Sequence, residues 1–311
     1  MKSGKLAVIR AHPGLLLPVV GALLIFFLAF ARPVLQPFIS SLAEGRVPVE
    51  QIRITHGGAD RSYWLHRPSG LGGQAPLLMV LHGVGQSPRG VARLTGFSQI
   101  ADRERFLVAY PEGIGHRWND GANVFESDDV GFLSAVIEHV AKNHQIDRSR
   151  VFMTGVSAGG MMSYRFACEG GGAAVAVATV VGNLPERVAA KCTSASPTSV
   201  LAVAGRDDRV IYYEGETGRH LSAEASAEHW ARLDGCQESR TSPPDGKPPS
   251  WAASRASHSQ CHAATGVSLM SFNGGHDWPT ARGALLGFRS GGPNPLSEEI
   301  WRFFAAHPRP S

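Results

Sequence analysis

A serine with the surroundings of a nucleophile lies in the middle of the chain, at Ser157. Residues 151–162 read VFMTGVSAGGMM: an apolar run typical of a strand, then Gly-Val-Ser-Ala-Gly, then a stretch typical of a helix. A G-x-S-x-G sequence between a strand and a helix predicts a sharp turn that exposes the serine hydroxyl. The glycines two residues before and after the serine allow strand and helix to approach each other. We therefore expect Ser157 to be a catalytic nucleophile.

A serine hydroxyl needs a base to take its proton and an acid to orient that base. The predicted base is His276, which follows the apolar run 267–272 on a loop that begins Asn-Gly-Gly. Asp207 and Asp208 follow the apolar run 199–203, so either aspartate completes the chain order Ser, Asp, His. Adjacent side chains point in different directions, so we expect only one to reach His276. Spacing alone does not choose between them.

Two amides are expected to bind the negatively charged oxygen that forms when the serine attacks a carbonyl. One is the amide of Ala158, directly after the nucleophile, and the other belongs to the glycine-rich loop after the apolar run that ends at Leu81. Gly83 and Val84 are the candidates in that loop, and we prefer Val84 because its amide follows the glycine at which the chain turns away. His82 is interpreted as shaping this loop through hydrogen bonds.

The elements that would position these residues alternate between strand and helix patterns along the chain. Strands are expected near residues 51–55, 61–66, 76–81, 106–110, 151–154, 174–181, 199–203 and 267–272, and helices at 97–105, from Asp128 onward, at 223–233 and at 295–306. This alternation predicts an α/β fold with a mainly parallel sheet and helices on both faces. Asp128 and Asp129 suit the start of their helix, where they would cap it.

The start of the chain reads as an export signal. Residues 14–31 carry no charge and follow a positive stretch, which suits a cleaved signal peptide or a membrane anchor. Lys2, Lys5 and Arg10 account for three of the four net positive charges, and the remaining +1 predicts no nucleic-acid partner. We expect residues 1–31 to be the signal or anchor, 32–50 a linker and 51–311 one catalytic domain, secreted or periplasmic, with membrane contact only through an uncleaved N-terminus.

Four cysteines fit an oxidising compartment: Cys168, Cys192, Cys236 and Cys261. They form no C-x-x-C pair and have no histidine at zinc-finger spacing, so we expect no metal site. Pairing neighbours in the sequence would close two loops of similar size, while four buried free thiols are the alternative. Residues 242–260 are rich in proline, serine and glycine, which predicts an excursion loop.

The assembled motifs resemble a known enzyme family. LHGVGQS (81–87), YPEGIGHRWND (110–120), DDVGFL (128–133), TGVSAGGMM (154–162), GRDDRVIYYEG (205–215) and GGHDWP (274–279) occur in this order. They are similar to blocks in the secreted polyhydroxybutyrate depolymerase and feruloyl esterase group, which is related to family 1 carbohydrate esterases. The resemblance implies an α/β-hydrolase fold and a Ser-Asp-His triad of Ser157, Asp208 and His276.

The same resemblance implies further roles. Trp118 and Trp278 match tryptophans expected to bind substrate, and the cysteines match disulfides joining Cys168 to Cys192 and Cys236 to Cys261. Ala204 stands where the family has histidine and Tyr212 where it has proline, which puts the positioning of the acid loop in question.

The predicted activity is a serine esterase that needs no cofactor and acts on hydroxyalkanoate oligomers or feruloyl and other aryl esters. The chain ends at Ser311, directly after its last expected helix, which favours soluble esters over a crystalline polymer. The alternatives are a serine peptidase of the same fold and a non-catalytic binding protein of the cell envelope.

Overall fold

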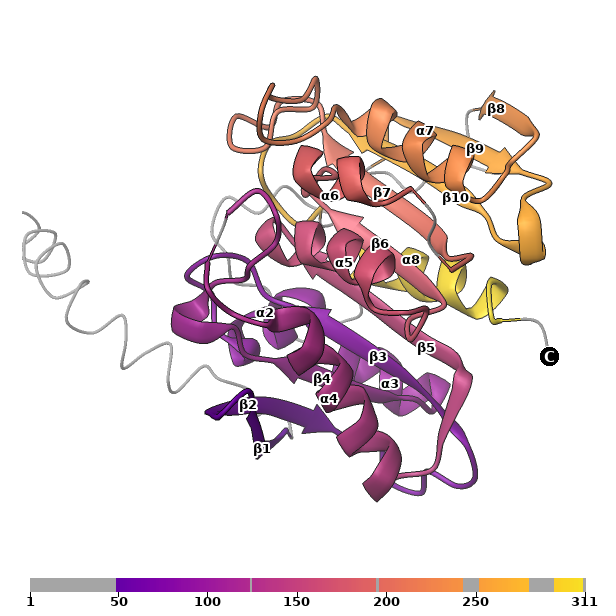
Figure 1. The fold of residues 1–311 in the computed structure, drawn as a ribbon. Helices are drawn as coiled ribbons and strands as arrows, with labels where there is room; N and C mark the ends of the chain where they lie inside the picture. Colours follow the sequence, from indigo (N-terminus) through magenta and orange to yellow (C-terminus); the bar gives the residue numbers. More distant parts are fainter. Residues whose placement is uncertain (1–48, 124, 194–195, 243–251, 280–293, 310–311) are drawn as a thin grey trace, which may run out of the picture. The chain divides into compact units, whose positions relative to one another are not determined.

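A ten-stranded sheet forms the centre of the protein in the computed structural model, which describes residues 49–123, 125–193, 196–242, 252–279 and 294–309 (Figure 1). In chain order the strands are β1 (Glu50–His56), β2 (Ala59–His66), β3 (Ala75–Leu81), β4 (Leu107–Pro111), β5 (Ile146–Val156), β6 (Ala176–Val180), β7 (Ser199–Gly205), β8 (Glu238–Ser242), β9 (Ser254–Ser259) and β10 (Val267–Phe272). Their order across the sheet is β1-β2-β4-β3-β5-β6-β7-β10-β9-β8.

The middle of this sheet is parallel and its two edges are antiparallel. Strands β4, β3, β5, β6, β7 and β10 run in one direction, whereas β1 and β2 on one side and β9 and β8 on the other pair antiparallel. Every residue of β3, β4, β6, β7 and β10 is buried, as expected for strands covered on both faces. The carboxyl ends of the parallel strands therefore share one edge, where their loops meet.

Helices cover both faces of the sheet. They are α2 (Pro88–Thr95), α3 (Phe97–Glu104), α4 (Asp129–Asn143), α5 (Ala158–Glu169), α6 (Glu186–Lys191), α7 (Ala223–Leu233) and α8 (Pro295–Ala306), with short 3₁₀ turns η1 (Ile114–His116) and η2 (His262–Ala264). Apolar side chains of α4, α5, α6 and α7 share one core with the sheet, and those of α2, α3 and α8 share the other. Figure 1 shows α4 to α7 in front of the strands and α8 behind them.

The predicted α/β architecture is confirmed, and two details of it are corrected. The stretch 242–260 is not a loop throughout, because β9 runs through it and pairs with β10. Helices α2 and α6 were not expected; α2 begins at Pro88 after the cap Ser87, whose side chain accepts a hydrogen bond from Gly90 N. The capping predicted for Asp128 is present, since its carboxylate accepts a hydrogen bond from Gly131 N.

Two disulfides join segments that lie apart in the sequence. Cys168 pairs with Cys192 and Cys236 with Cys261, which are the pairs expected from the sequence.

The predicted export segment, and nearly all of the predicted linker, lie outside the described residues. Among the residues that are described, no helix is both long enough and apolar enough to cross a membrane.

Candidate active site

The turn between β5 and α5 holds Ser157 in a strained backbone conformation. Its φ of 56° and ψ of −122° lie in a region that residues with a side chain rarely adopt. Such strain costs on the order of 1 to 3 kcal/mol and persists only where the surrounding structure enforces it. The amide of Ser157 donates to Val180 O at 2.9 Å, which ties the turn to β6. The helix that starts directly afterwards points its first amides toward the serine.

Glycine is required beside this serine because backbone lies too close for any side chain. A Cβ on Gly159 would lie 2.5 Å from Leu81 O and 2.7 Å from His82 O. Since these atoms belong to the backbone at the end of β3, they cannot rotate away. The second glycine of the G-x-S-x-G sequence therefore lets α5 pack against β3, and this packing brings the loop after β3 next to Ser157.

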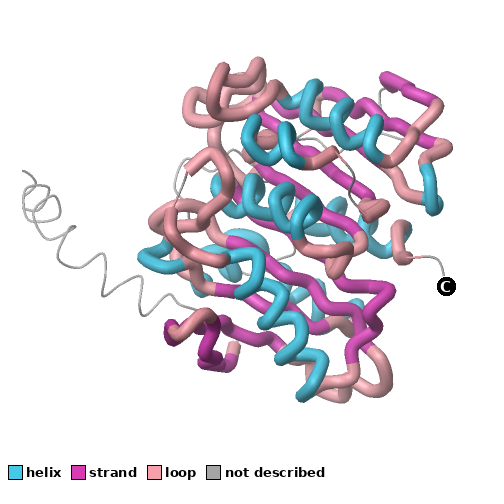
Figure 2. The backbone as a smooth tube through the Cα atoms, viewed as in Figure 1, coloured by secondary structure: helices cyan, strands magenta, loops and turns pink. Residues whose placement is uncertain are grey.

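Three side chains that are far apart in the sequence form a hydrogen-bonded chain at this edge of the sheet. His276, after β10, has its Nε2 atom 2.8 Å from Ser157 Oγ and its Nδ1 atom 2.7 Å from Asp208 Oδ2. Asp208 follows β7. Figure 2 shows the loops that follow β5, β7 and β10 on the same side of the sheet. With Nδ1–H donating to the carboxylate, Nε2 is free to accept the serine proton, which is the arrangement that serine hydrolysis needs.

Of the two adjacent aspartates, only Asp208 contacts the histidine. Its other oxygen, Oδ1, accepts hydrogen bonds from Val210 N at 2.8 Å and Ile211 N at 2.9 Å, which leaves Oδ2 to face His276. Asp207 is exposed, and its amide donates to Gly274 O. Burial raises the pKa of Asp208, but the hydrogen bonds from His276, Ile211 and Val210 outweigh burial and hold that pKa below its ordinary value. The carboxylate is therefore charged at neutral pH.

The loop after β3 lies directly beside the nucleophile. A Cβ on Gly83 would lie 3.4 Å from Ser157 Cβ. The Gly83 amide is already used, because it donates to Gln86 Oε1 at 2.9 Å. Val84 is the next residue, and its side chain is 53% exposed. Gln86 was not expected to have a role, although it lies in one of the blocks that carry the resemblance.

His82 is a buried neutral link between two loops. Gly113 N donates to His82 Nε2 at 3.0 Å, so this ring nitrogen carries no proton and Nδ1–H donates to Gly83 O at 2.8 Å. Burial lowers the pKa of His82 to about 4, which agrees with a neutral ring. The predicted structural role of His82 thus takes the form of a bridge from the loop after β3 to the loop after β4.

Neither tryptophan expected to bind substrate reaches an open surface. Trp118 is 0% exposed, packs against the His82 ring with centroids 4.9 Å apart, and donates its indole N–H to His82 O at 2.8 Å. Trp278 is 4% exposed and makes an edge contact with Phe97. Their burial favours a supporting role for both indoles, and the substrate contact that the resemblance implied stays a prediction.

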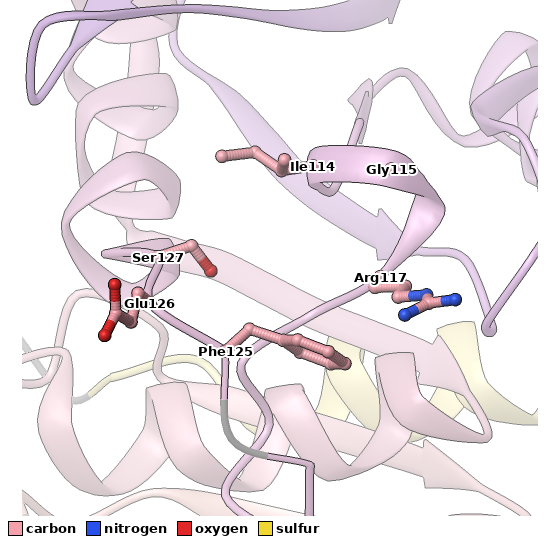
Figure 3. A pocket seen from close by; sticks show the side chains of 6 residues that line it. All are labelled: Ile114, Gly115, Arg117, Phe125, Glu126 and Ser127. Atoms are coloured by element: carbon pink, nitrogen blue, oxygen red, sulfur yellow. The ribbon is translucent and has the colours of Figure 1, made fainter.

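A hollow of about 370 Å³ opens in the loop that follows β4. It is lined by Ile114, Gly115, Arg117, Phe125, Glu126 and Ser127. Figure 3 shows these side chains on two neighbouring segments, 114–117 and 125–127. None of the three hydrogen-bonded residues lines it. It adjoins the loop beside Ser157, however, because Gly85 N donates to His116 O at 2.9 Å.

A buried ion pair contacts one wall of this hollow. Asp129, at the first turn of α4, accepts a hydrogen bond from Arg61 at 2.8 Å, and both side chains are almost fully buried. Its second oxygen accepts from Asn119 N and from Ser127 Oγ, each at 2.8 Å. One carboxylate thus joins Ser127, which lines the hollow, to Asn119, two residues beyond the other lining segment.

Comparison with known proteins gives matches to esterases. A family model described as esterase PHB depolymerase matches residues 61–215, a range that includes Ser157 and Asp208. The chain is 31% identical to a probable feruloyl esterase C of Aspergillus niger over 212 residues, or 68% of each protein. It is 30% identical to poly(3-hydroxyalkanoate) depolymerase C of Paucimonas lemoignei over 176 residues, which are 54% of this chain and 42% of that enzyme.

Solved structures of the same fold include esterases. The acetyl xylan esterase from Aspergillus awamori superimposes with a TM-score of 0.60, covering 83% of this chain and 99% of that chain. Its sequence identity is 12%, so the likeness concerns the fold, which is that of the α/β-hydrolases.

Proposed function

This chain belongs to the esterase PHB depolymerase family and is a carboxylic-ester hydrolase, and we propose that it cleaves its ester through an acyl-enzyme formed on Ser157. The observation that carries this proposal is the continuous set of contacts from Ser157 through His276 to Asp208. A serine hydroxyl in this arrangement can lose its proton to the histidine as it attacks a carbonyl carbon.

The reaction follows from the roles of the neighbouring groups. As Ser157 Oγ bonds to the carbonyl carbon, His276 Nε2 takes its proton and the carbonyl oxygen becomes negative. The amides of Ala158 and Val84 bind this oxygen. The bond to the alcohol oxygen then breaks, and His276 returns the proton to it. A water molecule, deprotonated by His276, then attacks the carbonyl carbon of the acyl-enzyme. As the bond from this carbon to Ser157 Oγ breaks, His276 returns the proton to Oγ and the acid leaves, while Asp208 holds the histidine throughout.

We also propose that the catalytic domain, residues 51–311, works outside the cytoplasm. Support comes from the two disulfides, which persist in oxidising compartments, and from the uncharged segment 14–31 after a positive N-terminus. For the substrate we propose an ester of hydroxyalkanoate, feruloyl or other aryl type, supported by the names of the similar proteins.

The test of the mechanism is loss of hydrolysis in Ser157→Ala. We expect kcat on p-nitrophenyl butyrate to fall by on the order of 10⁶, as when other serine triads lose their nucleophile. Ser69→Ala, at an exposed serine between β2 and β3, is the matched control and should retain full activity. Both variants should unfold thermally like the unmodified protein. Near-normal turnover by Ser157→Ala would contradict the proposed function.

A further inference from the structure

Four large apolar side chains are about half exposed within the residues that the structure describes. They are Val84, Ile114, Val210 and Tyr212, with exposed fractions of 53%, 53%, 55% and 48%. A single exposed apolar side chain needs no explanation, but a group of them gathered around one site marks a binding surface. All four lie on loops at the edge of the sheet that holds Ser157.

The order of the strands divides these residues into two pairs. Ser157 follows β5, while Val84 follows β3 and Ile114 follows β4, on one side of it. Val210 and Tyr212 follow β7, on the other side, where His276 follows β10. An ester bound at Ser157 therefore has an apolar pair on each side.

Hydrogen bonds to the backbone hold three of these four residues in place. The amide of Val210 donates to Asp208 Oδ1, and Tyr212 O accepts from Asn183 Nδ2 at 3.0 Å. On the other side, Ile114 O accepts from Arg117 N at 3.2 Å. Since the backbone of these three residues is held while their side chains are exposed, a ligand can contact them without ordering a loop, which favours binding.

The chemistry of the proposed reaction assigns a part of the ester to each pair. His276 must give its proton to the alcohol oxygen as this oxygen leaves, so the alcohol part faces the loops after β7 and β10. The acyl group points away from that oxygen, toward the loops after β3 and β4. The hollow beside Ile114, of about 370 Å³, provides room for an acyl chain on that side.

We propose that Ile114 and Val84 contact the acyl part of the substrate and that Tyr212 and Val210 contact its alcohol part. The preferred substrate is then an ester with an apolar group on both sides of the scissile bond, in preference to a small acetyl ester of a polar alcohol. This inference rests on the proposed esterase function and adds the substrate class and the residues that select it.

Two pairs of esters test this assignment. p-Nitrophenyl hexanoate and p-nitrophenyl acetate differ only in the acyl part, while benzyl butyrate and methyl butyrate differ only in the alcohol part and have leaving alcohols of similar acidity. The readout is the ratio of kcat/KM within each pair. Both esters of a pair meet the same enzyme preparation, so partial unfolding of a variant cancels from the ratio.

Ile114→Ser should lower the hexanoate-to-acetate ratio by about tenfold, the size expected when a pocket loses an apolar contact, and should change the benzyl-to-methyl ratio less than about twofold. Tyr212→Ser should lower the benzyl-to-methyl ratio by about tenfold and should change the hexanoate-to-acetate ratio less than about twofold. Tyr212→Phe keeps the ring and should keep both ratios. Arg219→Ala is the matched control, because Arg219 is exposed on the same loop and pairs only with Glu216 within the described residues.

The assignment requires that Ile114→Ser lowers only the hexanoate-to-acetate ratio and that Tyr212→Ser lowers only the benzyl-to-methyl ratio. Equal loss of both ratios in either variant, no change in either ratio, or an exchange of the two effects would each overturn it while leaving the esterase function intact. A folded, unmodified protein that hydrolyses none of the four esters would instead contradict the proposed function.

Discussion

Gly155, two residues before the nucleophile, offers a steric test of how the site is assembled. A Cβ at this position would lie 2.3 Å from both the carbonyl carbon and the oxygen of Gly159. Its φ is not in the left-handed region, so alanine suits the local backbone and only the space is missing. The change Gly155→Ala should therefore push α5 away from β5 at the turn that carries Ser157.

The size of the effect follows from the distances. Ordinary contact begins near 3.4 Å, so the methyl group requires a separation of about 1 Å between strand and helix (3.4 minus 2.3 Å). Misplacing a catalytic group by about 1 Å costs on the order of 10²-fold in rate. Overpacking of this kind also destabilises the fold by about 1 to 3 kcal/mol. We expect kcat/KM to fall roughly 100-fold in protein that is still folded at 25 °C.

The assay is hydrolysis of p-nitrophenyl butyrate, with thermal unfolding measured on the same samples. Gly160→Ala is the matched control, because its nearest neighbour, Gly155 O, would be 3.2 Å from the new Cβ and a small adjustment suffices. It should retain most of the activity. If Gly155→Ala stays within about threefold of the unmodified protein, or if Gly160→Ala loses as much, the steric reasoning is wrong.

Three further predictions follow from the contacts of the site and its surroundings. Asp208→Asn should lower kcat by about 10⁴-fold because the histidine loses its orienting charge, whereas Asp207→Asn should have little effect; steady-state kinetics distinguish them. Because the pKa of His82 falls from 6.5 to about 4 on folding, the unfolded chain binds the proton first as pH drops, so stability is lost from pH 6.5 down to 4. Urea unfolding at pH 7 and at pH 4 measures this loss. The unfolding free energy of the unmodified protein should fall between these pH values by about 3 kcal/mol more than that of His82→Gln. Equal falls in the two proteins would contradict the reasoning about His82. Replacing Cys236 and Cys261 by serine opens a loop with a sequence separation of 25 residues and should cost about 3.5 kcal/mol in unfolding free energy while leaving turnover intact.

The centre of the fold could be predicted because burial on both faces leaves a strong pattern. The apolar run 267–272 matches the bounds of β10, and 223–233 and 295–306 match those of α7 and α8. These elements form the core, so composition and periodicity specify them directly. The predicted base and the pair of adjacent aspartates could be placed by the same means, because each follows a buried strand, but the choice of Asp208 over Asp207 came from the family resemblance.

The edges of the fold leave no such pattern. Strand β9 reads SRASHS, and its side chains are half-buried or exposed, so nothing in its composition indicates a strand. It exists because it pairs with β10, a contact between segments that only the folded chain brings together. Helix α6, with six residues, is too short for a periodic signal.

The residues whose side chains hold the loops of the site could not be predicted from the sequence, for a related reason. Gln86 accepts a hydrogen bond from the amide of Gly83. Asp129 accepts hydrogen bonds from Arg61 and from Asn119 and Ser127 in the loop after β4. Each of these is a contact between a side chain and distant or irregular backbone, which spacing along the sequence does not encode. The burial of Trp118 against His82 is likewise a contact that the family resemblance did not imply.

The central claim is that Ser157 becomes acylated, and labelling with a fluorophosphonate tests it most directly. Such a reagent reacts with a serine that an adjacent base has activated, and mass spectrometry of tryptic peptides locates the adduct. We expect one adduct, on Ser157 within the peptide of residues 151–165, and none in Ser157→Ala. An adduct on another residue, or an active enzyme that is never labelled, would contradict it.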